Sequence, residues 1–460
     1  MHDLTILGAE AVSELRADFQ GAVYEPGDVG YTDACTIFNG MFDRQPALVA
    51  RPAGVPDVIR AIGLARTANA PLAIRGGGHS VAGFSLCDGG VVVDMRSLNR
   101  VEIDAGARIA RVGGGTTWGE FDGAAQAHGL ATTGGRVTST GVAGFTLGSG
   151  SGWLERRLGL AADTLVSVEL VTADGEVVRA TEDENADLLW GLRGAGGNFG
   201  VVTEMEFRLA EVGPLVYGGL MLFDPAVSRD VIRTWRDVSK TAPDGVGWGV
   251  ASICAPPEDF IPAEWRGKRV IGVLGMGSQE DMEPALAPLR ALKPFLDAFQ
   301  PMPYTAFQGI IDPANPYGRR NYWRAHNLAA IEDSTIDVYL DRAESITSPF
   351  TAFIILHMGG AVARVGENDT ALSGRSAPFN VHLNCMWEGA DGDEANIAWV
   401  RATSQALQPH LAPGMALNFT TEIGDAELRD SYGAKLDRLR ALKRTWDPGN
   451  VFRLNQNIAP

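Results

Sequence analysis

Hydrophobic positions follow different patterns in the two halves of the chain. Up to about residue 212, short apolar runs alternate with stretches rich in glycine. These runs predict strands at residues 46–51, 72–75, 91–93, 101–112 (a hairpin), 165–172, 176–180 and 201–209. Amphipathic spacing predicts helices at residues 10–21, 55–68, 116–129 and 186–192. The first half is therefore predicted to mix helices and strands, joined by glycine loops.

From about residue 214 glycine becomes rarer, and strands alternate with longer amphipathic helices. Strands are predicted near residues 216–223, 246–254, 269–276, 352–358, 378–387 and 415–420. Helices are predicted near residues 226–240, 279–292, 334–346, 393–409 and 425–444. An antiparallel sheet backed by helices produces this alternation, so we expect an α+β fold with two lobes.

The polar C-terminal stretch carries a regular apolar pattern at Phe452, Leu454 and Ile458, and we expect it to return to the first lobe. At 460 residues the chain is too long for one ordinary core. We predict a first domain at residues 1–212, a second at 213–424 and a C-terminal segment at 425–460.

Composition narrows the function classes. A hydrophobic fraction of 45% and a charged fraction of 21% are typical of soluble globular proteins. The net charge of −17 argues against a nucleic acid or an anionic membrane as partner. Cys35, Cys87, Cys254 and Cys385 have neither metal-ligand spacing nor the density of a disulfide framework. Because no long apolar run or signal-peptide pattern is present, we expect a cytoplasmic protein, either monomer or homodimer.

The loop Arg75-Gly76-Gly77-Gly78-His79-Ser80, between two predicted strands, is the first candidate for chemistry. Three consecutive glycines let the backbone turn sharply and approach a ligand closely. Their N–H groups can form a concave site for an anion such as a pyrophosphate. His79 adds an imidazole that can act as a nucleophile or carry a covalent bond. The alternative is an ordinary glycine loop with a solvated histidine.

Two further glycine-rich stretches follow, at residues 133–159 and 194–200. In the first of these, glycine recurs too often for a helix interior, where each costs about 1 kcal/mol relative to alanine. We therefore expect non-helical backbone lying along a flat or extended ligand. The chain lacks G-x-G-x-x-G, a Walker loop, H-E-x-x-H and G-x-S-x-G, which argues against the sites that these motifs build.

Four motifs in order resemble the berberine-bridge-enzyme-like flavoproteins of the vanillyl-alcohol-oxidase/PCMH superfamily: R-G-G-G-H-S (75–80), T-G-V-A-G-F-T-L-G-S-G-S-G-W-L (140–154), G-G-N-F-G-V-V-T (196–203) and F-R-L-N-Q-N-I (452–458). The resemblance implies that the first lobe binds FAD and that the antiparallel sheet of the second covers the isoalloxazine ring. It implies cofactor contacts at Arg75, Gly76, Gly77, Gly78, His79, Ser80, Gly83, Thr138, Gly141, Gly144, Gly148, Gly152, Val202, Asn455 and Asn457.

The resemblance also implies a covalent bond between His79 and FAD. Some members of the family have a second link through a cysteine, but the matching residue here is Val137. A single link through His79 is therefore expected.

Flavin oxidases of this kind remove a hydride from a C–H bond next to oxygen or nitrogen and need a base for the companion proton. Two positions that carry the base in relatives are Ala416 and Ile354 here. Among the remaining candidates, His382 ranks first because it shares one face of a predicted strand with Asn380 and Asn384. Tyr322 and His357 follow; the first is equally consistent with a packing aromatic, and the second with a core histidine.

Thr140 matches the position that controls oxygen access in relatives, although a well-packed β-branched residue is an equal reading. We expect a small-molecule substrate and O2 as partners, with release of H2O2. A monooxygenase that uses an oxygenated flavin is the alternative. A non-catalytic flavin-binding or ligand-binding protein is a third hypothesis, motivated by the two missing bases.

Overall fold

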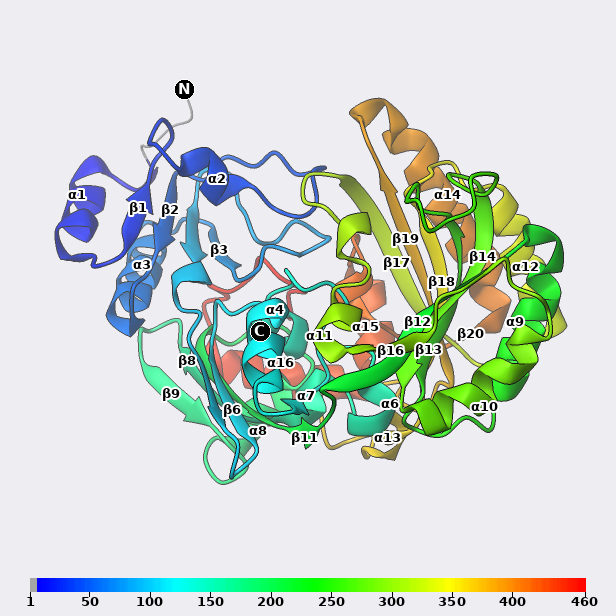
Figure 1. The fold of residues 1–460 in the computed structure, drawn as a ribbon. Helices are drawn as coiled ribbons and strands as arrows, with labels where there is room; N and C mark the ends of the chain where they lie inside the picture. The colour runs from blue at the N-terminus through cyan, green and yellow to red at the C-terminus, as the bar shows by residue number, and fades with distance from the viewer. Residues whose placement is uncertain (1–5) are drawn as a thin grey trace.

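The computed structural model describes residues 6–460, which form two lobes and a C-terminal segment that passes between them (Figure 1). The first lobe begins with a four-stranded sheet of order β1-β2-β4-β3, in which β1 is antiparallel to β2 and the other pairs are parallel. Its elements are α1 (Ala9–Asp18), β1 (Ala22–Tyr24), α2 (Tyr31–Cys35), β2 (Leu48–Arg51), α3 (Val55–Thr67), β3 (Leu72–Arg75) and β4 (Val91–Asp94).

A second sheet of the first lobe is antiparallel and has the order β5-β6-β10-β8-β9. Its strands are β5 (Val101–Asp104), β6 (Ile109–Gly113), β8 (Leu165–Val171), β9 (Val177–Ala180) and β10 (Val201–Arg208). The short strands β7 (Leu130–Ala131) and β11 (Ala210–Glu211) pair with each other. The helices are α4 (Trp118–Gln126), α5 (Val142–Leu147), α6 (Glu155–Leu158), α7 (Ala161–Thr164) and α8 (Ala186–Leu192).

The second lobe is built on a nine-stranded antiparallel sheet with the main order β15-β12-β14-β13-β18-β19-β17-β20, and β16 also pairs with β12. The strands are β12 (Leu215–Phe223), β13 (Gly247–Cys254), β14 (Arg269–Gly277), β15 (Leu296–Asp297), β16 (Gln300–Pro303), β17 (Arg320–Leu328), β18 (Ala352–His357), β19 (Phe379–Trp387) and β20 (Leu411–Met415). The helices are α9 (Ser228–Ser239), α10 (Gln279–Arg290), α11 (Tyr304–Gln308), α12 (Asp333–Glu344), α13 (Ala361–Arg364) and α14 (Asp393–Leu407).

Helices α9, α10, α12 and α14 lie on one side of this sheet, where their apolar faces form a common core with it (Figure 1). Val250, Val273, Val381 and Leu383 point into that core. Because side chains alternate along a strand, the residues between them point to the other side, towards the first lobe. The sheet therefore presents a second face that can line a site between the lobes.

Three predictions from the sequence pattern were wrong. Residues 142–147 form the helix α5 within the glycine-rich stretch that we expected to be non-helical. The strand expected at 415–420 is replaced by the end of β20 and a 3₁₀ turn at Leu417–Phe419. The helix expected at 425–444 is divided into α15 (Asp425–Tyr432) and α16 (Leu436–Trp446), because Gly433 adopts a φ of +52° between them.

Strand β17 was missed altogether, because it alternates polar and aromatic residues without a clear apolar face. In the folded chain it pairs with β19 along its whole length, from Arg320 opposite Trp387 to Leu328 opposite Phe379. Asp393 accepts hydrogen bonds from the Arg320 guanidinium, so this polar side chain is satisfied by a residue distant in sequence. Tertiary pairing thus determines this strand.

After α16, the C-terminal segment crosses the first lobe beside the loop 194–200 (Figure 1). Lys443 and Asp447 are fully buried at its start, and the Lys443 ammonium donates to the backbone carbonyls of Asn198 and Phe452. The expected return of the tail to the first lobe is therefore seen in these contacts. Across residues 6–460, no helix combines the length and the apolar character that crossing a bilayer requires.

Asp122 of α4 is a buried carboxyl whose titration bears on stability. Gln308 donates to its Oδ2 at 2.9 Å, and its Oδ1 has no partner among the described residues. Burial raises the pKa of Asp122 to about 7. Because the folded pKa lies above the unfolded one, the folded state binds the proton more tightly. Stability is then lost as the pH rises from about 4 to about 7.

Replacing Asp122 by asparagine should remove this loss. The gain in unfolding free energy is expected to grow by about 1.4 kcal/mol per pH unit across that interval. Urea unfolding at pH 5 and pH 8 should therefore show a gain that is roughly 2–3 kcal/mol larger at pH 8. The exposed Asp391→Asn is the matched control, and a gain in Asp122→Asn that is equal at both pH values would contradict the argument.

Candidate active site

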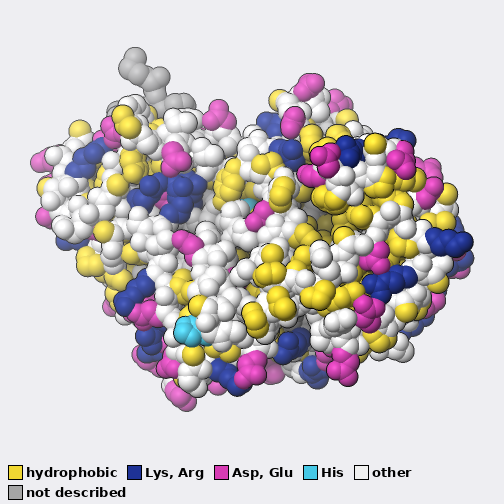
Figure 2. All heavy atoms as spheres, in the orientation of Figure 1, with side chains coloured by type: hydrophobic (Ala, Val, Ile, Leu, Met, Phe, Trp, Pro, Cys, Tyr) yellow, Lys and Arg dark blue, Asp and Glu magenta, His cyan; other side chains and the backbone are white. Residues whose placement is uncertain are grey.

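A cavity of about 1030 Å³ is lined by residues of both lobes and of the C-terminal segment. It lies at the upper end of the range for small-molecule and cofactor sites, so it can take a large cofactor together with a substrate. The first lobe contributes its glycine loops, and the second contributes the free face of the nine-stranded sheet. Figure 2 shows hydrophobic side chains gathered on the surface of the second lobe, beside the junction of the lobes.

The first glycine loop meets the second by backbone contact. A Cβ on Gly77 would lie 2.3 Å from the nitrogen of Gly141, and a Cβ on Gly141 would lie 2.4 Å from the nitrogen of Gly77. Gly78 has a φ of +75°, a conformation that favours glycine. Gly76, Gly77 and Gly78 all line the cavity together with Ser80. The two loops thus bring bare backbone to the cavity wall.

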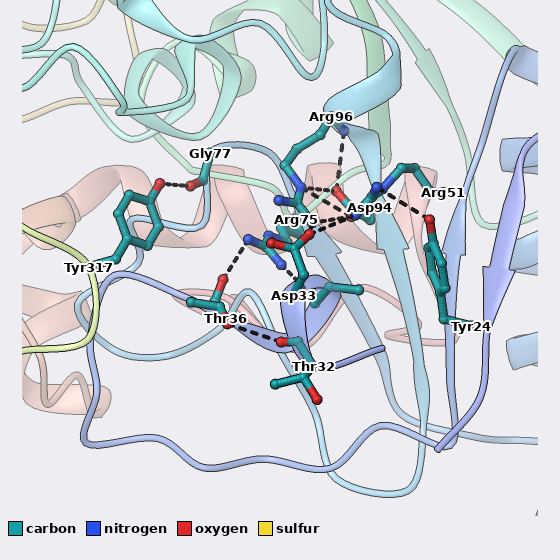
Figure 3. Close-up of polar contacts among 11 residues, drawn as sticks. Tyr24, Thr32, Asp33, Thr36, Arg51, Arg75, Gly77, Asp94, Arg96 and Tyr317 are labelled. Atoms are coloured by element: carbon teal, nitrogen blue, oxygen red, sulfur yellow. Dashed lines mark hydrogen bonds and ion pairs between the residues drawn. The ribbon is translucent and has the colours of Figure 1, made fainter. Parts of the chain in front are cut away.

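Arg75 does not line the cavity, contrary to its expected role as a cofactor contact. Its guanidinium donates to the carbonyl oxygens of Ala34 and Thr36 behind the loop, the latter at 2.6 Å (Figure 3). Burial lowers the pKa of Arg75, and the nearby Asp94 carboxylate opposes that effect. On the other side of the loop, the Tyr317 hydroxyl of the second lobe donates to the carbonyl of Gly77 (Figure 3). Arg75 therefore fixes the loop from behind.

His79 projects into the cavity from the end of this loop. Its ring stacks on Phe38 with centroids 4.5 Å apart, and the edge of Tyr317 approaches it at 5.1 Å. Its remaining accessible edge faces the cavity, and burial lowers the pKa of His79 to about 3, so the ring is neutral at pH 7. Nε2 lies 2.8 Å from the Ser139 hydroxyl. Nδ1 has no hydrogen bond within residues 6–460, which leaves it able to bond carbon.

The glycines of the second stretch fall into two groups. We expected Gly148 and Gly152 to contact the cofactor, but neither residue lines the cavity. A Cβ on Gly148 would lie 2.0 Å from Oδ1 of Asn418, and one on Gly152 would lie 2.1 Å from the carbonyl oxygen of Gly134. These two residues are glycine because the protein itself packs against them.

Gly141 and Gly144 do line the cavity. Gly144 lies inside α5, yet a Cβ there would meet no atom within 4 Å. Nothing in the protein excludes a side chain at this position, although glycine weakens a helix. A ligand that lies against α5 explains the absence of a side chain. The cradle thus fits a flat or extended group such as FAD.

Gly144→Ala is expected to have opposite effects on the empty and the loaded protein. The flavin-free protein should be stabilised by roughly 0.5–1 kcal/mol, because alanine favours the helix. Flavin content should fall, because the added methyl group occupies the ligand's space. Gly123→Ala is the matched control, since Gly123 is an exposed glycine in α4 with the same open surroundings and no part in the cavity. Thermal unfolding and flavin absorbance measure the two effects; normal flavin content in Gly144→Ala would contradict the assignment.

Three further expected cofactor contacts lie outside the cavity wall, and two lie on it. Thr138 donates its backbone N–H to Asp312 at 2.9 Å, Gly83 packs beneath the ring of Phe42, and Asn457 does not line the cavity. Val202 and Asn455 do line it. The Asn455 amide nitrogen donates to Gly197 and Phe452, both at 2.9 Å, while its Oδ1 is buried without a partner in the described chain. Such an oxygen can accept a hydrogen bond from the polar edge of a ligand.

The structure places His382, on β19, at the cavity. Its ring is buried and meets the edge of Phe419 at 4.6 Å. Neither ring nitrogen has a hydrogen bond to another described residue. Burial lowers the pKa of His382 to about 3, and the positive charge of Arg136 adds to this effect. The ring is therefore neutral at pH 7 and has a lone pair available.

Tyr322 and His357 lie away from the cavity, which removes both from the set of candidate bases. Tyr322 points to the helix side of the sheet, where its hydroxyl donates to Glu422 and accepts from Arg401 at 3.2 Å. Nε2 of His357 accepts from the Arg156 guanidinium at 3.0 Å. Burial and that guanidinium lower the pKa of His357 to about 3, so its lone pair is already engaged. Successive side chains of a strand point to opposite faces of the sheet, so a shift of one residue along β17 or β18 decides whether a side chain faces the cavity.

Arg136 and Asn384 line the cavity, although the sequence argument assigned Arg136 no role. The Arg136 guanidinium pairs with Glu155 at 2.9 Å, and it lies 4.8 Å from the ring centroid of Trp153. Both charged groups are shielded from water; burial lowers the pKa of Arg136 and raises that of Glu155. The only available sign in the sequence was the position of Arg136 directly before Val137. Thr140 and Val137 also line the cavity.

Known proteins match this chain over nearly its whole length. Residues 46–181 match the family described as FAD binding domain, and residues 424–459 match the family described as berberine and berberine like. An FAD-linked oxidoreductase of Dictyostelium discoideum is 28% identical over 98% of this chain and 97% of its own. The (R)-6-hydroxynicotine oxidase of Paenarthrobacter nicotinovorans is 28% identical over 96% of this chain and 97% of its own.

The solved structure of Physcomitrella patens BBE-like 1 has a TM-score of 0.88 and 22% identity, covering 98% of this chain and 99% of that one. At this identity the likeness shows a shared fold. The two-lobed α+β architecture expected from the sequence is thereby confirmed.

Proposed function

We propose that this chain, which is similar to berberine bridge enzyme-like FAD-linked oxidoreductases, oxidises a C–H bond next to oxygen or nitrogen in a small molecule and passes the electrons to O2, giving H2O2. The observation that carries the proposal is one continuous cavity whose wall contains both the glycine cradle and His382. Bound FAD supplies the two-electron acceptor for such an oxidation.

In this proposal FAD is attached through His79 alone. The neutral ring, the free Nδ1 and the fixed orientation given by Ser139 and Phe38 suit a nitrogen that bonds carbon. Val137 lines the cavity but has no nucleophilic atom, so no second bond is expected there. Gly141, Gly144 and Asn455 would hold the ligand by close backbone contact and by the unpaired amide oxygen.

His382 is proposed to take the substrate proton. Its neutral ring can accept a proton, and because the ring makes no hydrogen bond to a described residue, a nitrogen is left for the substrate. Its low pKa makes it a weak base in the empty protein, so a bound substrate must contact it directly. Closure of the cavity by the nine-stranded sheet would keep water from competing.

The domain limits 1–212, 213–424 and 425–460 remain part of the proposal.

An oxygenating reaction is the second candidate, because Thr140 lines the cavity. The two reactions differ in the fate of oxygen. An oxidase yields one H2O2 per substrate oxidised and no label from 18O2 in the product. A monooxygenase incorporates one labelled oxygen atom and yields little H2O2. Stoichiometric 18O incorporation would replace the oxidase proposal by the alternative, and failure of purified protein to take up flavin would exclude both.

A further inference from the structure

The second-lobe wall of the cavity is apolar along four neighbouring strands. Leu220 on β12, Leu274 on β14, Ile253 on β13, and Ile354 and Leu356 on β18 all face the cavity. Aliphatic side chains offer no hydrogen bonds, so a ligand hydroxyl placed against them loses its bonds to water without replacement. This wall therefore disfavours a ligand that is polar all round, such as a sugar.

Part of the wall has almost no side chains. Gly249 and Ala251 on β13 line the cavity beside Gly272 on β14, and Ala251 stands opposite Gly272 in the sheet. Neighbouring strands are about 4.8 Å apart and alternate residues about 6.7 Å apart. We call these three residues the bare patch. The side chain of Leu356 lies close to Gly249 and that of Leu220 close to Gly272, so the patch is an apolar area bordered by leucines, against which an aromatic or alicyclic ring can lie.

The loop between β13 and β14 continues the apolar wall to the surface. Pro256, Pro257 and Phe260 line the cavity, and the side chain of Phe260 is 59% exposed. An exposed phenylalanine beside a cavity is typical of a site that receives an apolar ligand. The apolar wall thus extends from the bare patch to the mouth.

On the second-lobe wall, buried polar atoms without a partner lie on β19 and on the neighbouring β17, where Nε1 of Trp323 stands opposite Asn384. His382 and Asn384 occupy adjacent positions on the cavity face of β19. Oδ1 of Asn384 is buried and has no hydrogen bond in the described chain, and the His382 ring beside it makes no hydrogen bond to a described residue. Buried polar atoms without partners are costly, so a ligand that supplies one donor and one acceptor here would be favoured.

The two arginines at the cavity wall are already paired, whereas Glu258 at the exposed end of the wall adds an unpaired negative charge. Arg136 pairs with Glu155 at 2.9 Å. Arg319 pairs with Glu388 at 3.6 Å and lies over the ring of Phe350. Neither arginine is therefore a free cation for an anionic ligand, which would have to be desolvated without compensation.

From these features we propose that the substrate is a neutral, largely apolar ring compound whose polar atoms lie at one end, with its ring on the bare patch and its polar end at His382 and Asn384. The inference names the substrate class of the proposed oxidase and rests on that function. On this proposal, sugars and carboxylates should bind poorly to the cavity.

Three probes test the proposal on the flavin-loaded protein under anaerobic conditions. 2-Naphthol is neutral and amphiphilic, 2-naphthoate has the same rings with a negative charge, and cellobiose is neutral but polar all round. Changes in the flavin absorbance report binding without turnover. We expect 2-naphthol to bind at least tenfold more tightly than 2-naphthoate and cellobiose to give no saturable change. Equal or tighter binding of either of the other two probes would overturn the inference.

A variant links the effect to the bare patch. Ala251→Trp should fill it and weaken 2-naphthol binding at least tenfold, with flavin content unchanged. Ala226→Trp places the same side chain at an exposed position away from the cavity and should have no effect. Ala352→Trp, on β18, is a second cavity variant for the case in which Ala251→Trp does not fold.

The outcomes separate the two proposals. Flavin-loaded protein that fails to bind 2-naphthol, or that binds it equally well in both cavity variants, overturns the substrate class and leaves the oxidase proposal standing. Protein that takes up no flavin overturns the oxidase proposal and the inference with it.

Discussion

Replacing His79 by alanine is expected to release FAD completely when the protein is precipitated with acid, whereas the wild type should give a yellow pellet. In the wild type a covalent bond would survive unfolding, because it does not depend on the cradle. His79 is positioned for that bond by Ser139 and Phe38 and is neutral because it is buried. Alanine removes the nitrogen but leaves the glycine loops intact, so the variant should still bind FAD reversibly before precipitation.

Mass spectrometry of the precipitated chain measures the result directly. His128→Ala is the matched control, because His128 is exposed and lies outside the cavity, and it should retain the full flavin mass. A flavin mass that persists on the His79→Ala chain would show that another residue carries the bond. A wild-type chain with no added mass would refute covalent attachment while leaving reversible FAD binding possible.

Lys443→Met is expected to lower the free energy of unfolding by roughly 3–5 kcal/mol, the range for removing one partner of a buried ion pair. Lys443 and Asp447 are both completely buried, with Nζ and Oδ2 2.7 Å apart. The ammonium also donates to the carbonyl oxygens of Asn198, at 2.7 Å, and Phe452, at 2.9 Å. Methionine would fill the space but leave these acceptors and a carboxylate unpaired.

The same change should reduce flavin content, because Lys443 joins the loop that contains Asn198 to the tail that carries Asn455 into the cavity. Urea unfolding and flavin absorbance measure both effects. Lys240→Met, at an exposed lysine, should change stability by no more than about 1 kcal/mol. The double variant Lys443→Met/Asp447→Asn should recover part of the loss, since it removes the unpaired charge. A loss below about 1 kcal/mol in Lys443→Met would contradict the assigned role of the pair.

Much of the fold followed from periodicity in the sequence. The strands of the second lobe at 216–223, 246–254, 269–276, 352–358 and 378–387 lie within about two residues of β12, β13, β14, β18 and β19. Each has an apolar side that packs against helices, and that side is visible in the sequence as a regular pattern. Strand β17 has no such pattern and could not be found, because its polar side chains find partners only in the folded protein.

The candidate site was predictable where a residue type is required by the backbone or by chemistry. The triple glycine and His79 both lie on the cavity wall. The prediction failed where the direction of a side chain depends on contacts that exist only in the folded protein. Arg75 adjoins the same glycines but turns to Ala34 and Thr36, and Tyr322 turns to the helix side of the sheet. The place of Arg136 at the cavity was not predicted, because its ion-pair partner Glu155 lies in a different segment of the chain.

The sequence by itself determined the local features of this protein: the glycine loops that allow close approach, the apolar strand faces that bury a core, and the family to which its motifs point. Only the tertiary structure decided which face of each strand meets the cavity, which glycines serve protein packing rather than a ligand, and which polar groups are left without partners. The physical reason is that local conformation depends on neighbouring residues along the chain, whereas side-chain direction, burial and pairing depend on residues that folding brings together from distant segments.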